Sequence, residues 1–149
     1  MLNIDIESYI PHRKPILLIS EVLEIDDELG VTVATVQPDW PLCDGREINS
    51  LILVETVAQT AALVEGYKRI KDGKPGAKGW LVGIKHAEFN VANIPVATRL
   101  VIRVTSQYSF DNYGVVEGTV KSGEKVLATM VLQALRIDDN SKNIFGGEK

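Results

Sequence analysis

Residues 50–69, SLILVETVAQTAALVEGYKR, form the segment that most constrains how this chain can fold. A helix built from this segment carries apolar residues on nearly every side, which predicts a buried helix and not a surface one. Its apolar part, residues 51–64, is too short and too often interrupted to span a bilayer, which takes roughly 20 mostly apolar residues. The rest of the chain is therefore expected to pack around this helix.

One carboxylate, that of Glu55, lies in the first turns of the predicted helix, and Gln59 follows one turn later on the same side. A carboxylate in a buried helix must be paired, hydrogen-bonded, protonated or functional. Two interpretations stay open. Glu55 could stabilise the helix start through the macrodipole, beside a cap at Asn49 or Ser50, or it could belong to an active site.

The size and charge of the chain exclude several classes of protein. Its 149 residues fit one domain, which we place at residues 1–137, and the polar tail at 138–149 is expected to be disordered. The net charge of -4, without a basic run, argues against nucleic-acid binding. No signal peptide or membrane-spanning run is recognised. We therefore expect a cytoplasmic location and no association with a membrane.

The cysteine and histidine content argues against a disulfide framework and against a metal site. The chain has one cysteine, Cys43, and two histidines, His12 and His86. A single cysteine cannot form an intramolecular disulfide, and a Cys/His zinc site within one chain needs more ligands than these. We therefore expect no metal.

Six runs with the composition of β-strands surround the helix segment. The last three are separated by Asp-Asn and Ser-Gly turn signals, which indicate an antiparallel meander, and the first two are expected to pair as a hairpin. The runs are residues 16–25, 31–36, 80–89, 98–110, 113–121 and 125–137. The intervening segment 37–49 has two prolines and an Asp-Gly and is predicted to be a loop.

This order predicts an α+β fold in which a curved antiparallel sheet of about six strands wraps round one long apolar helix. A single wrapped sheet leaves a helix flank and an edge strand uncovered, so we expect a second copy of the chain to cover them in a homodimer. Trp40, on the loop that leads into the helix, could pack in the core or contact a substrate.

Several motifs resemble those of one enzyme superfamily. PHRKPILLISEVLEI (residues 11–25) is similar to the Pro-His-Arg-x-Pro-x-Leu-Leu opening of bacterial (3R)-hydroxyacyl-acyl-carrier-protein dehydratases, which have the hotdog fold. LILVETVAQTAA (51–62) resembles their Glu-x-x-Ala-Gln helix, and VGIKHAEF (82–89) resembles their Val-Gly-Ile-x-x-Ala-x-Phe strand. The resemblance covers roughly residues 10–136 and keeps the family's order.

The resemblance implies an active site at a homodimer interface, where the helix carboxylate of one subunit, Glu55, faces a histidine of the other. Gln59 is the helical neighbour of Glu55 and a candidate substrate contact. The resemblance also implies that the amides of Ser50 and Leu51 hold the thioester oxygen, which agrees with the free N–H groups and positive dipole expected at a helix start. The substrate would be an acyl chain carried on the phosphopantetheine of acyl carrier protein or on coenzyme A, with no further cofactor. Trp40 is kept as a candidate substrate contact.

The sequence departs from this family at its catalytic histidine. The His-Phe-Pro-Gly motif that precedes the helix is absent, because no histidine lies between His12 and His86, and Ser50 replaces the glycine before the helix. A looser branch, the dehydratase-like proteins of aryl-polyene gene clusters, also lacks this motif and keeps Pro-His-Arg and a Glu-x-Met-Ala-Gln-Thr helix. ETVAQT (residues 55–60) is similar to this Glu-x-Met-Ala-Gln-Thr motif.

Three functions follow from these observations. The first is dehydration of a 3-hydroxyacyl thioester in fatty-acid or polyene biosynthesis, with Glu55 as the acid and His12, on its loop between two prolines, as the base; His86 is the weaker choice. Dehydration would need Glu55 protonated, and burial would raise its pKa. The second is a thioesterase that uses ionised Glu55 without a histidine. The third is a non-catalytic subunit that binds acyl chains or completes a heterodimer with a paralogue.

Overall fold

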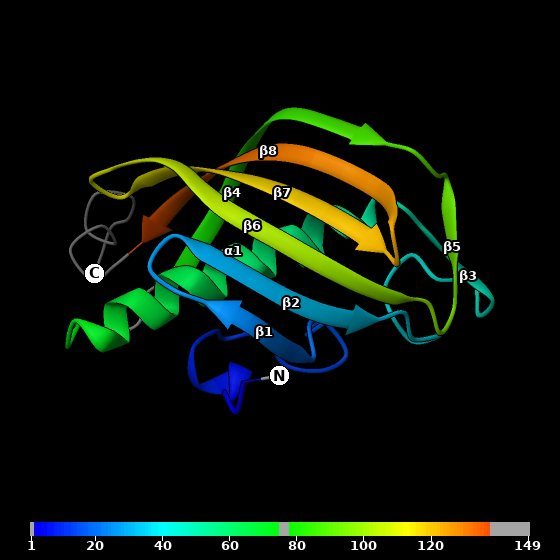
Figure 1. The fold of residues 1–149 in the computed structure, drawn as a ribbon, viewed down its shortest axis with the longest axis horizontal. Helices are drawn as coiled ribbons and strands as arrows, with labels where there is room; N and C mark the ends of the chain where they lie inside the picture. The colour runs from blue at the N-terminus through cyan, green and yellow to red at the C-terminus, as the bar shows by residue number, and fades with distance from the viewer. Residues whose placement is uncertain (1, 75–77, 138–149) are drawn as a thin grey trace, which may run out of the picture.

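The computed structural model describes residues 2–74 and 78–137, and the predicted tail at 138–149 lies outside the described residues. Six antiparallel strands form one curved sheet, and the helix α1 (Ile52–Lys71) lies on its concave side (Figure 1). Across the sheet the strands are β1 (Glu21–Ile25), β2 (Leu29–Thr35), β6 (Arg99–Phe110), β7 (Tyr113–Ser122), β8 (Lys125–Ile137) and β4 (Lys78–Phe89). This is the predicted hotdog fold.

The predicted hairpins are confirmed, and two local predictions need correction. β1 pairs with β2, and β6, β7 and β8 form the meander. The predicted first strand is shorter than expected, because residues 16–20 lie before β1 and bond to other parts of the chain. Within the predicted loop, β3 (Glu47–Asn49) pairs with β5 (Asn93–Pro95). Strands of three residues are too short to show an alternating pattern, so the sequence did not reveal this pair.

The helix α1 is buried on most of its surface, but not on all sides as the sequence predicted. Leu53 and Val57 are completely buried against the sheet, in a cluster that includes Ile102. A second cluster forms where Ile6 and Ile10 of the N-terminal segment pack with helix residue Leu63. These two layers leave one flank of the helix open, so its apolar residues are only partly covered by the described chain.

That open flank begins at the start of the helix. Leu51, just before α1, is 58% exposed, and the side chain of Glu55, one turn later, is 40% exposed. Val54 and Ala58 are also only partly buried. Glu55 therefore lies on the face of α1 that neither the sheet nor the N-terminal segment covers.

The two edges of the sheet differ in how they are covered. The N–H of Leu2 donates to the carbonyl of Val22 in β1 over 2.8 Å, so the N-terminal residues bond to that edge. The opposite edge is β4, which pairs only with β8 among the described strands. It exposes Leu81, Val82 and Ile84 at 44%, 55% and 51%. An uncovered apolar edge of this kind is a ready site for association.

Candidate active site

The structure brings His12 and Glu55 together. The Nε2 atom of His12 lies 3.6 Å from Oε2 of Glu55, with the two side chains 27% and 40% exposed. His12 belongs to the loop that precedes β1, and Glu55 to the first turns of α1. Both side chains are therefore held in place and open to one side, as an acid and a base that act on a bound molecule must be.

Gln59 connects these two parts of the chain. Its Nε2 donates to Oε2 of Glu55 over 2.8 Å and to the carbonyl of Ile16 over 2.7 Å. Its Oε1 accepts the N–H of Leu18 at 2.9 Å and that of Ile19 at 3.5 Å. Gln59 is completely buried, and these bonds use every donor and acceptor of its amide. Gln59, a predicted substrate contact, therefore joins the segment after His12 to helix α1. Its amide has no hydrogen-bonding capacity left for a ligand.

The segment before His12 lies directly on the helix. A Cβ atom at Gly66 of α1 would be only 2.4 Å from the carbonyl oxygen of Tyr9, so only glycine permits this approach. Ile6 and Ile10 pack beside it. The Nδ1 atom of His12 is buried without a hydrogen-bond partner in the described chain, which leaves Nε2 as the nitrogen that faces Glu55.

The helix starts two residues later than predicted, and this changes which amide groups are available. The N–H of Ser50 donates to the carbonyl of Ala92, and that of Leu51 to Oδ1 of Asn49, each over 2.9 Å. Both amides predicted to hold a thioester oxygen therefore already have acceptors. Ile52 is the first residue of α1, and no acceptor for its N–H lies within the described part of the chain. The sequence could have indicated Ile52 only if the helix start had been placed correctly.

Asp44 orders the loop that leads into β3 and then α1. Its Oδ1 accepts the N–H groups of Arg46 and Glu47 at 2.8 and 2.9 Å. These bonds from Glu47 and Arg46 favour the ionised carboxylate and lower the pKa of Asp44 below its ordinary value of 3.8. The Asp-Gly sequence here is a hydrogen-bonded turn that fixes the approach to the helix start.

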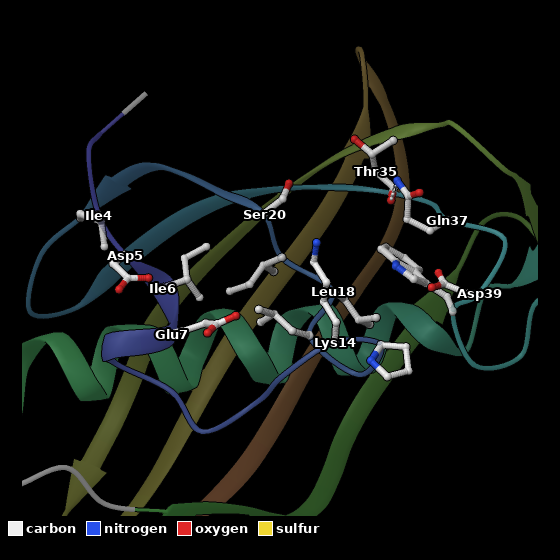
Figure 2. Close-up of a pocket in the computed structure, with 14 residues that line it drawn as sticks. Ile4, Asp5, Ile6, Glu7, Lys14, Leu18, Ser20, Thr35, Gln37 and Asp39 are labelled. Carbon is white, nitrogen blue, oxygen red and sulfur yellow. Dashed lines mark hydrogen bonds between the residues drawn. The ribbon is translucent and has the colours of Figure 1, made fainter.

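A cleft of about 610 Å³ lies beside the loop that carries His12, and Trp40 lines it. Figure 2 shows Asp5 and Glu7 at one end of this cleft, Gln37 and Asp39 at the other, and Lys14 between them. Neither His12 nor Glu55 lines it. Trp40 itself is 5% exposed and belongs to the main core, so its predicted contact with a substrate stays a prediction.

The second histidine lies elsewhere. His86 is exposed on β4, and no contact with Glu55 is found. Within residues 2–74 and 78–137, no three His, Cys, Asp or Glu side chains gather closely enough to hold a metal ion. Among the described residues, no helix has the length and apolar character needed to cross a membrane.

Comparison with known proteins identifies relatives of this chain. Residues 4–145 match the model of the ApeP-like family, described as ApeP dehydratase. The 3-hydroxyacyl-[acyl-carrier-protein] dehydratase FabZ of Streptococcus pneumoniae is 28% identical over 136 residues, which cover 86% of this chain and 92% of that protein. The FabZ of Alkaliphilus metalliredigens is 28% identical over 146 residues, which cover 93% of this chain and 96% of that protein.

Solved structures confirm the fold. The dehydratase heterocomplex ApeI:P from Xenorhabdus doucetiae contains a chain that superposes with a TM-score of 0.86 at 21% sequence identity. The superposition covers 97% of this chain and all of that one, 100%.

Proposed function

This chain belongs to the ApeP-like dehydratase family, and we propose on that basis that it dehydrates a 3-hydroxyacyl chain on acyl carrier protein to the trans-2-enoyl thioester. The similarity to 3-hydroxyacyl-[acyl-carrier-protein] dehydratases along most of the chain supports this substrate class. The acyl chain would arrive on phosphopantetheine, and the reaction needs no other cofactor.

The proximity of His12 and Glu55 is the observation that carries the proposal. Dehydration needs a base for the proton on C2 and an acid for the hydroxyl on C3. We assign the base to Nε2 of His12 and the acid to the protonated carboxyl of Glu55, 3.6 Å apart. Because Oε2 of Glu55 accepts a hydrogen bond from Gln59, the acidic proton belongs on Oε1, which can face the substrate.

The partial exposure of both side chains lets solvent close the catalytic cycle. His12 takes the C2 proton, the electrons of that C–H bond form the C2–C3 double bond, and the hydroxyl leaves as water with the proton of Glu55. The enzyme is then left with a protonated imidazole beside a carboxylate. Exchange with solvent then removes the proton from Nε2 of His12 and returns one to Oε1 of Glu55, which restores both groups.

Negative charge builds on the thioester oxygen when the C2 proton is removed, and a backbone N–H can stabilise it. Ile52 offers such a group at the positive end of the helix dipole, one turn before Glu55. We assign this role to Ile52 in place of Ser50 and Leu51, whose N–H groups bond to Ala92 and Asn49.

A second subunit completes the site in this proposal. Glu55 lies on the open flank of α1, and β4 is the sheet edge that the described chain leaves unpaired. A partner that adds a strand at β4 would bring its own helix towards this flank and close the acyl-binding space. The partner is a second copy of the chain in our proposal, and a paralogue in a heterodimer is the runner-up.

One experiment separates the candidate functions. The purified chain is incubated with 3-hydroxyacyl-carrier protein and, separately, with the enoyl thioester, and the products are identified by mass. Dehydration gives loss or gain of one water with the thioester intact, whereas a thioesterase releases the free acid. If the chain alone converts neither thioester but does so once a paralogue is added, the chain is a partner subunit of a heterodimer.

A further inference from the structure

Arg13 is bonded to the loop that carries His12 at several points. The loop has no regular secondary structure around His12, so the position of the imidazole depends on such contacts. Nη1 of Arg13 donates to the carbonyls of His12 and Ile10 over 2.8 and 3.0 Å. Nη2 donates to the carbonyl of Glu7 over 3.2 Å. One guanidinium thus binds three backbone carbonyls within residues 7–12.

Arg13 also holds the chain on the other side of His12. Its own carbonyl accepts the N–H groups of Ile16 and Leu17 at 2.9 and 3.0 Å. Its Nε lies 3.3 Å from the carboxylate of Glu7. The carbonyl of Ile16 is in turn bonded to Gln59. Ile16 therefore links Arg13 to the helix.

We propose that Arg13 is a positioning residue that holds the imidazole of His12 against Glu55. The inference rests on the proposed function, in which these two groups react. Arg13 itself does not contact Glu55; it acts through the backbone of the loop. A guanidinium suits this role because it presents five N–H donors in a rigid plane, whereas the ammonium of lysine is a single point that cannot reach all three carbonyls together.

A different role for Arg13 predicts a different result. The side chain is half exposed, and an exposed cation could instead attract an acidic carrier protein. Loss of such an attraction raises KM and leaves the imidazole of His12 where it is. Loss of a positioning contact lowers kcat and moves the imidazole, since misplacement by about 1 Å can cost roughly 10²-fold in rate.

The histidine content of the chain allows a direct test. His12 and His86 are the two histidines, so ring-labelled histidine gives two NMR signals, and the exposed His86 serves as an internal reference. In the wild-type background, Glu55→Gln should shift the signal of His12 and leave that of His86 unchanged. In an Arg13→Ala background, the same Glu55→Gln change should no longer shift the His12 signal.

Kinetics of the same proteins complete the test. Arg13→Ala should lower kcat by about 10- to 100-fold with little change in KM, and Arg13→Lys should recover part of this loss. Arg103→Ala is the matched control, because it makes the same change at an exposed residue of β6, outside the His12 loop. It should retain the wild-type kcat and His12 signal.

Two outcomes would overturn the proposal. One is an Arg13→Ala protein in which His12 still responds to Glu55→Gln. The other is an unchanged kcat with a raised KM, which assigns Arg13 to carrier binding. The NMR measurement needs no turnover, so it stays informative if the chain proves not to be a dehydratase. If Arg13→Ala does not fold, the same comparison is made with Arg13→Lys.

Discussion

His12 Nε2 lies 3.6 Å from Glu55 Oε2, and both residues belong to the same chain. Gln59 makes this possible, because it bonds Glu55 on the helix and also the segment that follows the His12 loop. The groups proposed as base and acid therefore come from one subunit. In the proposed function, a partner subunit encloses the acyl chain and supplies neither group.

Glu55→Gln should abolish dehydration and leave the fold intact. The amide keeps the size of the side chain but cannot give a proton, so kcat should fall by roughly 10²–10⁴-fold. Glu65→Gln is the matched control, since Glu65 lies on the same helix, is 42% exposed and pairs with Arg136. Activity that survives Glu55→Gln would make Glu55 a structural residue.

His12→Ala should lower kcat by roughly 10²–10⁴-fold, because it removes the proposed base. The change is measured by initial rates with a 3-hydroxyacyl thioester. His86→Ala serves as the control, because His86 is exposed on β4 and should not affect the chemical step. Equal losses in both variants would contradict the assignment of the base to His12.

Gln59→Ala should destabilise the protein as well as reduce activity. It leaves the buried N–H groups of Leu18 and Ile19 without their bonds, and unsatisfied buried groups cost about 1–3 kcal/mol each. We expect the free energy of unfolding to fall by about 2–4 kcal/mol in denaturant titrations. Gln133→Ala, which removes a partly buried bond to Tyr113, should cost less. Similar losses of unfolding free energy from the two changes would argue against this structural role of Gln59.

Ile84→Lys should convert the proposed dimer to a monomer and reduce activity. Ile84 is 51% exposed on β4, so a lysine there is tolerated by a single chain but opposes strand addition at that edge. Light scattering at micromolar concentration measures the change in mass. Phe110→Lys alters a residue that is 69% exposed on β6 and should leave the dimer unchanged. A dimeric Ile84→Lys protein would place the interface elsewhere.

Asp44→Ala should lower the melting temperature at neutral pH, and the difference should shrink in acid. The N–H groups of Glu47 and Arg46 hold the pKa of Asp44 below 3.8 in the folded protein. Its contribution is therefore fully present above the unfolded pKa and is lost as the pH falls through the lower folded pKa. Gln37→Ala, a change at an uncharged residue of the same loop, is the control. A constant difference down to the acid range would contradict this role.

Local pattern in the sequence was sufficient for most of the fold. Alternation and turn residues indicated the two hairpin systems, and the apolar segment at 50–69 indicated the single helix, because these signals depend on neighbours a few residues apart. The same pattern singled out Glu55 as a carboxylate that needed an explanation. It did not reveal the pairing of β3 with β5, where three residues on each side are joined by long-range bonds.

The site itself was decided by tertiary structure. The sequence showed that a histidine and a glutamate were present. Contacts between distant segments, among them the packing of the N-terminal segment on Gly66 and the four bonds of Gln59, bring His12 to Glu55. The open flank of α1 also depends on where the sheet and the N-terminal segment end. Periodicity fixes which residues can be buried in a helix or strand, whereas contacts between distant segments fix which of them meet.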